Sequence, residues 1–270
     1  MAGQGYCSKD RDAGGRGIMG KKGGKAHLKR LLAPHFWRIP KKESVWAVRP
    51  TPGPHSKDAS IPLVVILRYI LDYAYTSKEA RRIIAEGKIE VDGKVRRNPR
   101  FSVGLMDVVE IPETKDLFRV LPAPRRGLIL HPIKKSEKNF KLCRIEDKTC
   151  VKRGYIQLNL HDGRNLLVEV KDPHNPVEDV YKVHDVVVLS LPKQEVKDHI
   201  KIEKDVTALT IAGKNLGLTG NIEKIEQGAA LHPSMVTLKR EDDTSFQTLL
   251  KYVFPIGVEK SLISLPEALT

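Results

Sequence analysis

The feature that most restricts the possible folds is a capped helix followed at once by a tight hairpin, between residues 76 and 95. Thr76 and Glu79 have the spacing of a capping box, and Gly87 stands where a helix is closed by a left-handed residue. Asp92-Gly93 favours a type I′ turn, which needs positive φ at both central residues. The sequence therefore predicts a helix between the two caps and a short hairpin behind it.

Basic residues are concentrated on this helix and hairpin. Eight Lys or Arg residues between positions 78 and 100 stand against four acids, and the whole chain has a net charge of +14. Surface charges are usually only a solvated face, but a local excess this large favours an anionic partner. Arginine suits bidentate phosphate contacts. We predict RNA contacts from these eight residues: Lys78, Arg81, Arg82, Lys88, Lys94, Arg96, Arg97 and Arg100.

The first 55 residues are the most basic region, with twelve Lys or Arg against three acids. The glycine-rich residues 1–25 have almost no apolar periodicity, so we expect them to be disordered in isolation. Four prolines between positions 40 and 54 favour an extended arm. We predict RNA contacts from Lys21, Lys22, Lys25, His27, Lys29, Arg30, His35, Arg38, Arg49 and His55.

Most of the remaining chain is predicted to be β structure. An apolar helix is expected over 63–75 first, with proline at its first turn. Alternating residues on either side of Asp162-Gly163 predict a second hairpin, and the run 186–191 predicts a strand buried on both faces. Further strands are predicted at 106–111, 208–211, 221–226, 235–238 and 244–248, with a glycine loop at 213–220. Short strands with frequent turns are typical of a small barrel.

Several of these segments resemble known RNA-binding elements. The helix and hairpin, Thr76 to Ile84 and Lys88 to Val95, resemble the S4 fold, and the glycine loop resembles a KOW motif. Together with Lys25 to Arg30 and Pro34 to Trp37, their order resembles the S4e family of archaeal and eukaryotic small-subunit ribosomal proteins, from about residue 24 onward. The resemblance implies binding to small-subunit ribosomal RNA, with roles for Lys25, Lys29, Arg30, Arg81, Arg82 and Arg96. The chain lacks the basic C-terminal extension that looks typical of eukaryotic members, which favours an archaeal type.

The resulting fold class is a multidomain α+β and β protein. We expect a basic N-terminal extension and arm (1–58), a helix-hairpin RNA-binding domain (59–112), a central β domain (113–200), a KOW-type small β-barrel (201–257) and a C-terminal tail (258–270). The glycine loop adds Lys214 and Asn215 as RNA contacts, although its glycines can equally serve a tight barrel turn.

The sequence predicts neither catalysis nor a cofactor. His161-Asp162 and His184-Asp185 are adjacent residues, which on a strand point to opposite faces, so we assign them to turns and strand edges. Cys143 and Cys150 lack the spacing of a zinc site and are expected to be buried thiols. The apolar run 61–75 is too short to span a bilayer. We predict no catalytic residue, metal, small-molecule substrate or membrane contact, and a cytoplasmic location.

Aromatic residues make up only 6% of the chain, which disfavours a platform for stacking unpaired bases and favours recognition of RNA shape. The predicted function is a structural constituent of the small ribosomal subunit, with ribosomal RNA and neighbouring ribosomal proteins as partners. Two alternatives remain. An RNA-modifying enzyme would need a separate catalytic domain, which residues 113–257 look too divided to supply. A KOW-containing transcription or translation factor would bind and leave the polymerase or the ribosome repeatedly, instead of residing there permanently.

Overall fold

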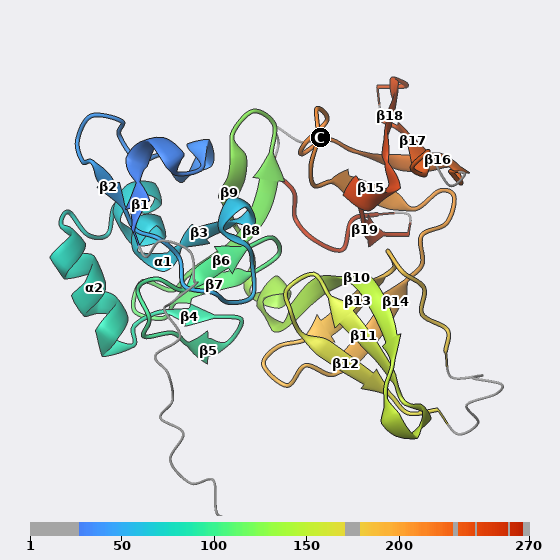
Figure 1. The fold of residues 1–270 in the computed structure, drawn as a ribbon, viewed down its shortest axis with the longest axis horizontal. Coiled ribbons are helices and arrows are strands. Elements are labelled where there is room, and N and C mark those ends of the chain that lie inside the picture. The colour runs from blue at the N-terminus through green and yellow to red at the C-terminus, as the bar shows by residue number, and fades with distance from the viewer. Residues whose placement is uncertain (1–26, 171–178, 229–231, 241, 259, 267–270) are drawn as a thin grey trace, which may run out of the picture.

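The computed structural model describes residues 27–170, 179–228, 232–240, 242–258 and 260–266. The predicted RNA contacts Lys21, Lys22 and Lys25 therefore lie outside the described residues, as does most of the glycine-rich tail. The described chain is mostly β structure with few helices, arranged as three five-stranded antiparallel sheets and two short strand pairs (Figure 1). No helix among the described residues is long and apolar enough to cross a membrane.

The capped helix and hairpin form as the sequence predicts. Helix α2 spans Ser77–Glu86; the Thr76 hydroxyl accepts from the Glu79 N–H at 3.2 Å, and the Glu79 carboxylate accepts from the Thr76 N–H at 3.1 Å. Gly87 closes the helix with a φ of 83°. Strands β4 (Glu90–Val91) and β5 (Lys94–Val95) flank a turn in which Asp92 and Gly93 have φ values of 55° and 69°. The capping box and the type I′ turn are confirmed.

The preceding helix is much shorter than predicted. It consists of α1 (Leu63–Val65) and a π-helical turn, Ile66–Ile70, whereas the apolar pattern predicts a helix to residue 75. Asp72 adopts a left-handed conformation with a φ of 54°, which Asp tolerates better than most residues and which ends the helix. Tyr75, the last residue of the predicted helix, is 92% exposed. Within this run, burial is continuous only over Leu63 to Leu67, and of the later residues only Ala74 is buried.

The sheet that carries the hairpin extends beyond residue 112, where the sequence places the end of this domain. Its order is β5-β4-β7-β8-β9, with β7 at Val108–Ile111, β8 at Asp116–Ala123 and β9 at Gly127–Pro132. β8 pairs with β7 over Asp116–Arg119 and with β9 over Phe118–Ala123, so residues 116–132 belong to this sheet and not to the central one. The strand predicted at 106–111 begins two residues later, because Met106 lies in a turn with a φ of 64°.

The N-terminal arm packs onto this unit. Strands β1 (Leu28–Lys29) and β2 (Trp46–Ala47) pair with each other, and β3 (Ser60–Pro62) pairs with β6 (Ser102–Gly104). Three 3₁₀ turns lie between them, at Arg30–Leu32, His35–Trp37 and Lys57–Ala59. Trp37 is fully buried and its indole N–H donates to the Ser60 carbonyl at 2.8 Å. The arm therefore shares the hydrophobic core of the helix-hairpin unit.

The central sheet has the order β12-β11-β10-β13-β14. Its bounds are β10 Phe140–Cys150, β11 Ile156–Leu160, β12 Asn165–Val168, β13 Val186–Ser190 and β14 Val196–Ile200, with 3₁₀ turns at Lys135–Asn139 and Lys152–Gly154. The predicted hairpin and the strand buried on both faces are confirmed. Cys143 is buried as expected, but Cys150 is exposed because it lies at the far end of β10, beyond the hydrophobic core.

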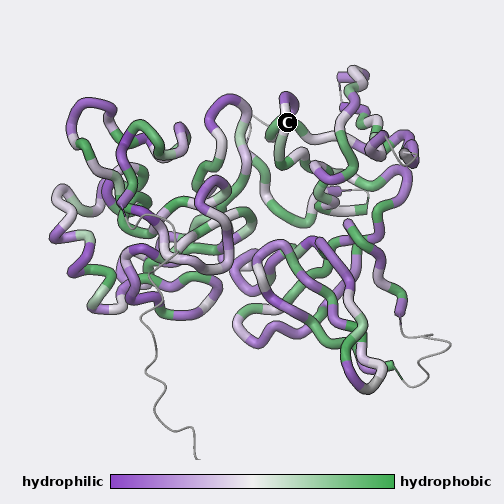
Figure 2. The backbone as a smooth tube through the Cα atoms, viewed as in Figure 1, coloured by the Kyte–Doolittle hydropathy of each residue, from purple (hydrophilic) through white to green (hydrophobic). Residues whose placement is uncertain are grey.

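The C-terminal sheet has the order β18-β17-β16-β15-β19. Its strands are β15 Thr207–Thr210, β16 Thr219–Glu226, β17 Met235–Lys239, β18 Ser245–Leu249 and β19 Val253–Gly257, with a 3₁₀ turn at Leu250–Tyr252. The first four match the predicted strands, whereas β19 was not predicted. Leu142 and Val186 of the central sheet share a core with Phe254 of β19. Hydrophobic stretches follow the strands of all three sheets, and hydrophilic loops surround them (Figure 2).

Candidate RNA interface

A groove between the β1–β2 pair and helix α2 brings together basic residues from distant parts of the chain. It has a volume of about 330 Å³, and no Asp or Glu is among the described residues that line it. Four of its five basic or histidine side chains belong to the predicted RNA contacts, and the fifth does not. The five are His27, Arg49, Arg68, Arg81 and Arg100, and we call this cavity the basic groove.

Arg68 is the member of the basic groove that sequence reasoning missed, because it lies inside an apolar run. Its guanidinium donates to the Glu43 carboxylate at 2.9 Å and to the Tyr75 carbonyl at 3.2 Å, and it lies 4.6 Å from the centre of the Tyr69 ring. These contacts fix the position of this cation. Its signal in the sequence is a single Arg interrupting an otherwise apolar helix.

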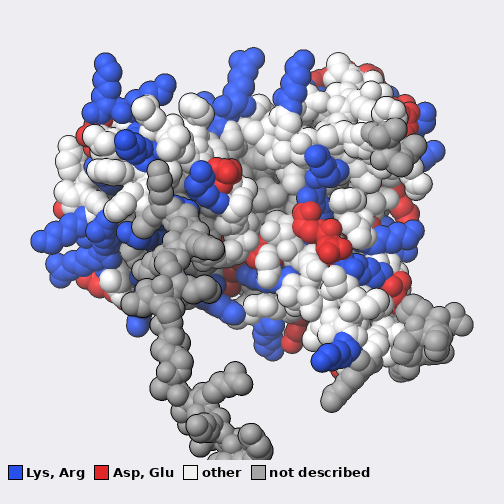
Figure 3. Space-filling view, viewed as in Figure 1, with Lys and Arg blue, Asp and Glu red and all other residues white. Residues whose placement is uncertain are grey.

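The other bases of the helix and hairpin lie mostly at the surface, and Figure 3 shows basic side chains gathered over α2. Lys78, Arg82, Lys94 and Arg97 are exposed. Arg82 forms an ion pair with Glu86 at 2.9 Å. Hydrogen bonds from Arg82 and Lys88 hold the pKa of the Glu86 carboxyl below its usual value. These charges are solvated and able to reach a phosphate.

Two bases near the hairpin are engaged more closely by the protein. Lys88 lies 3.2 Å from both Glu86 and Glu113, and hydrogen bonds to these carboxylates raise the pKa of the Lys88 ammonium. Arg96 is half-buried, with its guanidinium 4.4 Å from the centre of the Phe101 ring. Both side chains would have to rearrange partly to contact RNA.

A second basic surface lies at the turn between β8 and β9. A hollow of about 580 Å³ is lined there by His35, Phe36, Arg38, Arg125, Arg126 and Gly127. Gly127 has a φ of 75°, and a Cβ at this position would lie 2.6 Å from the Phe36 Cβ, so the turn approaches the N-terminal arm closely. Sequence reasoning missed Arg125 and Arg126, although two arginines between Pro124 and Gly127 are a readable turn signal.

The glycine loop of the C-terminal sheet lies against the same turn. A Cβ on Gly217 would lie 2.8 Å from the Pro124 Cδ, and Gly217 has a φ of 77°. This loop carries Lys214, which is exposed. We call the five side chains His35, Arg38, Arg125, Arg126 and Lys214 the basic ridge. Figure 3 shows basic side chains projecting along the upper edge of the molecule, above the arm and the β8–β9 hairpin.

Three predicted contacts have structural roles instead. The Arg30 side chain is buried, and its Nε donates to the Ile39 carbonyl at 2.8 Å. The His55 ring is buried with Nε2 3.1 Å from the Asp107 carboxylate. The Asn215 amide donates to the Gln247 carbonyl at 3.2 Å. Arg30 and His55 are therefore not available to RNA, contrary to the sequence prediction, whereas Lys29 is exposed as expected.

Charged side chains also meet in the interior, between the helix-hairpin sheet and the central sheet. Lys141 of β10 is 1% exposed and lies 2.9 Å from Asp92 and 3.0 Å from Asp162. Its ammonium also donates to Asp107, and Arg164 lies 3.1 Å from Asp162 and bonds Asp92 as well. We call these five residues the buried ion cluster. Asp92 thus serves both the predicted turn and this cluster.

The buried ion cluster keeps its members charged. Burial alone would raise the pKa of the Asp107 carboxyl, but the charges of Lys141 and His55 outweigh burial and hold this pKa well below its usual range. The pKa of Asp162 is lowered in the same way, by Lys141 against burial. Burial would lower the pKa of the Lys141 ammonium, yet the carboxylates of Asp107 and Asp92 raise it. These opposing effects are those expected of a paired, desolvated set of ions.

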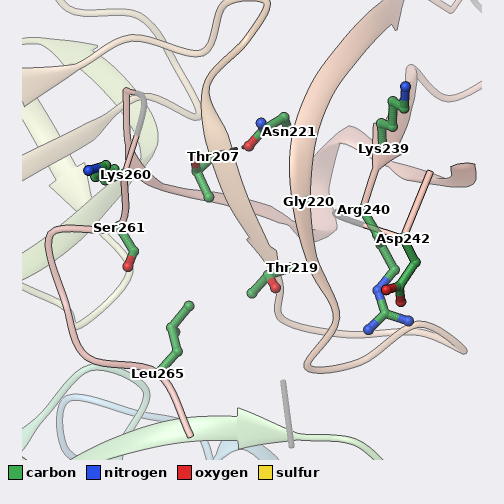
Figure 4. A pocket seen from close by; sticks show the side chains of 10 residues that line it. All are labelled: Thr207, Thr219, Gly220, Asn221, Lys239, Arg240, Asp242, Lys260, Ser261 and Leu265. Atoms are coloured by element: carbon green, nitrogen blue, oxygen red, sulfur yellow. Dashed lines mark hydrogen bonds between the residues drawn. The ribbon is translucent and has the colours of Figure 1, made fainter. Parts of the chain in front are cut away.

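Another hollow lies beside the C-terminal sheet, and none of the predicted contacts is among its described lining residues (Figure 4). It has a volume of about 660 Å³. The Thr207 hydroxyl donates to the Asn221 side chain at 3.0 Å, and Lys239 pairs with Asp243 at 2.7 Å. Among its described lining residues are one carboxylate, Asp242, and three basic side chains, Lys239, Arg240 and Lys260.

Three parts of the chain match the models of known protein families. Residues 22–58 match the RS4NT domain, residues 61–109 match the S4 domain, and residues 114–196 match ribosomal family S4e. The chain is 50% identical to the small ribosomal subunit protein eS4 of Desulfurococcus amylolyticus, over 92% of this chain and 99% of that protein. It is 44% identical to the eS4 protein of Methanocaldococcus jannaschii, over 92% of this chain and 100% of that protein.

A solved structure supports the same assignment. The crystal structure of the 30S ribosomal protein S4e from Thermoplasma acidophilum superimposes with a TM-score of 0.60 at 32% sequence identity, covering 74% of this chain and 96% of that one. The similarity to archaeal proteins extends over nearly the whole length on both sides. The chain therefore belongs to ribosomal family S4e, as its sequence resemblance predicts.

Proposed function

We propose that this protein is a structural, non-enzymatic constituent of the small ribosomal subunit, in the cytoplasm, that binds ribosomal RNA through the basic groove, the exposed bases of α2 and its hairpin, and the basic ridge. The relatives' names and the match to the S4 domain support this role. The observation that carries the RNA surface is the basic groove, where His27, Arg49, Arg81 and Arg100 line one cavity that has no Asp or Glu among its described lining residues. Other small-subunit proteins are the second class of partner.

The binding mechanism follows from the arrangement of these charges. Each phosphate that a Lys or Arg neutralises releases condensed counterions, so the logarithm of affinity falls by roughly 0.7 to 0.9 per tenfold rise in salt for each such contact. The groove and the ridge are held at a fixed separation by packed sheets, which suits recognition of a folded RNA by shape. Specificity would then come from the spacing of phosphates more than from base edges.

The C-terminal sheet would add a contact of its own. We infer that β15 to β19 form a KOW-type small barrel, because five short antiparallel strands surround one core and a glycine loop separates β15 from β16. In this proposal the loop presents Lys214 to RNA, while Asn215 braces the loop against Gln247. The proposed organisation is thus an arm packed on a helix-hairpin domain, a central β domain and this barrel.

A charge-reversal experiment tests the RNA surface. The variant Arg49→Glu, Arg81→Glu and Arg100→Glu should lose at least tenfold in affinity for small-subunit RNA, together with much of its salt dependence. The matched control reverses three exposed lysines of the central region, Lys193, Lys197 and Lys201, to Glu, with the same change in net charge. Equal losses in both variants would show that only the overall charge matters and would reject the groove as the interface.

The subunit assignment is tested separately, by sedimentation of cell lysate through a sucrose gradient in high salt. Mass spectrometry of the fractions should find the protein in stoichiometric amounts with known small-subunit proteins. Release to the top of the gradient would contradict a structural role and favour a factor that associates only in cycles.

A further inference from the structure

We propose that the basic groove holds one unpaired nucleotide of the bound RNA, with its base stacked on the indole of Trp46. This inference rests on the proposed RNA-binding function and adds a specific ligand class to one of its surfaces. Trp46 lines the groove together with His27, Arg68, Arg81 and Arg100. An aromatic ring among cations is the combination that binds a base and its phosphate together.

The two tryptophans of the chain have opposite environments. Trp37 is fully buried and hydrogen-bonded, whereas Trp46 is 56% exposed although it lies only nine positions further along the chain. Strand β2 explains the difference, since Ala47 pairs with the buried Leu28 and Trp46 pairs with the exposed Lys29 on the opposite face. The ribbon therefore holds the indole at the surface while Ala47 and Leu28 on the other face pack into the core.

The exposed indole is not covered by its aromatic neighbour. The ring centroids of His27 and Trp46 are 5.5 Å apart with an interplanar angle of 55°, so the imidazole is tilted against the indole and does not stack on it. Offset or parallel stacking is the arrangement in which an aromatic side chain binds a nucleobase. Among the described residues, the tilted His27 ring therefore does not occupy the stacking position on the indole, which a base could take.

The walls of the groove suit a nucleotide in both of its parts. The partly exposed Ala47, Val48 and Tyr69 supply apolar surface for a base, and the arginines supply donors for phosphate. The volume of about 330 Å³ is at the lower end of small-molecule sites, so one splayed-out nucleotide fits and an RNA double helix does not. Single-stranded loops and bulges provide such nucleotides.

The other possible occupant is an apolar side chain of a neighbouring protein, because Leu31, Leu32 and Val45 are also exposed in this arm. Charge complementarity decides between them. Arg49, Arg81 and Arg100 line the groove with no acidic partner among the described residues, and an apolar protein segment would leave these three cations desolvated and unpaired. An anionic ligand with an aromatic part satisfies both features.

The test uses the full chain and two ten-nucleotide probes, oligoadenylate and an abasic oligonucleotide with the same number of phosphates. Oligoadenylate should quench the fluorescence of Trp46, while Trp37 stays shielded in the core. Trp46→Leu should weaken oligoadenylate binding about tenfold or more, since stacking on one aromatic residue typically contributes that much. Trp46→Phe should keep most of the wild-type affinity for oligoadenylate. Neither variant should change the affinity for the abasic probe.

The outcomes separate this inference from the function on which it rests. If wild-type protein binds both probes equally, without quenching, and Trp46→Leu has no effect, base stacking is overturned and Trp46 becomes a protein contact, while RNA binding stands. If neither probe nor small-subunit RNA binds the wild-type chain, the proposed function itself fails. The signal of Trp37 in the Trp46 variants reports whether the core is still folded.

Discussion

The buried ion cluster and the basic groove both contain basic side chains, yet these cations are placed in opposite surroundings. In the cluster Lys141 meets three aspartates and is almost completely shielded from water. In the groove only Arg68 has an acidic partner among the described residues, and Arg49, Arg81 and Arg100 have none that the structure records. The comparison teaches that pairing and burial, and not residue type, decide whether a charge stabilises the fold or remains available to a ligand.

The two regions lie in different parts of the fold. The cluster joins the turn after β4, the start of β7, strand β10 and the turn after β11, so it connects the helix-hairpin sheet to the central sheet. The groove belongs entirely to the helix-hairpin unit and its arm. A change in the cluster should therefore act on stability, and a change in the groove should act on RNA binding.

The largest expected effect is on stability, from Lys141→Met. This change removes the central cation from three buried carboxylates, which keep only Arg164 and His55 as partners, and breaking a buried ion pair typically costs about 3–5 kcal/mol. Urea denaturation of the full chain measures the loss, and Lys197→Met on exposed β14 is the matched control, expected to change stability by less than about 0.5 kcal/mol. A loss no greater than the control's would mean that the cluster does not stabilise the junction.

The next largest effect is a dependence of folding stability on pH, caused by a buried histidine. His161 lies beside the cluster, its Nδ1 accepts from the Arg144 N–H at 3.2 Å, and Nε2 lies 3.3 Å from the Leu105 carbonyl. Burial, and then the charge of Lys141, lower the pKa of His161 to about 3. Below about pH 6.5 His161 binds a proton in the unfolded chain but not in the folded chain. As the pH is lowered, this residue therefore reduces the free energy of unfolding by up to about 1.4 kcal/mol per pH unit.

The variant His161→Gln should remove that contribution. Denaturation curves of both proteins between pH 7 and 4.5 should show a shallower decline for the variant, and the difference should reach about 2 kcal/mol near pH 5. The paired aspartates do not confound this range, because carboxylates with lowered pKa values lose their stabilising effect only as the pH falls below about 4. Parallel curves would contradict a neutral, buried His161.

A smaller effect is expected from Thr76→Ala, which removes the N-cap of the helix that forms one side of the groove. The hydroxyl that accepts from the Glu79 N–H is lost, at a typical cost of about 1 kcal/mol. Thr76→Ser is the control, since it keeps the oxygen. The salt dependence of RNA binding should stay unchanged, and a change in its slope would show that helix stability and RNA binding are coupled.

The smallest effect on stability is expected from Arg100→Ala in the groove. Its side chain is exposed, so unfolding should change by less than about 0.5 kcal/mol. The slope of log affinity against log salt should nevertheless fall by roughly 0.7 to 0.9, the loss of one phosphate contact. Filter binding at several salt concentrations measures the slope. Lys197→Ala should leave it unchanged, and an unaltered slope in Arg100→Ala would remove this residue from the interface.

Local chemistry made several elements predictable. The capping box at Thr76, the left-handed Gly87 and the type I′ turn at Asp92 depend on residues within a few positions of one another, and all three are present in the structure. Strand alternation around Asp162-Gly163 was equally local. The prediction of a helix to residue 75 was wrong because apolar composition indicates burial but does not indicate where the backbone turns.

The sequence by itself determined the capped helix, the hairpins, most strand positions, the basic character and the family, because these depend on short-range backbone preferences, periodicity and residue order. Only the tertiary structure decided that Arg30 and His55 are buried, that Arg81 and Arg100 meet His27 in one groove, and that β8 and β9 extend the first sheet. A charge acquires its role from neighbours far away in the chain, whose distance and burial no local pattern encodes.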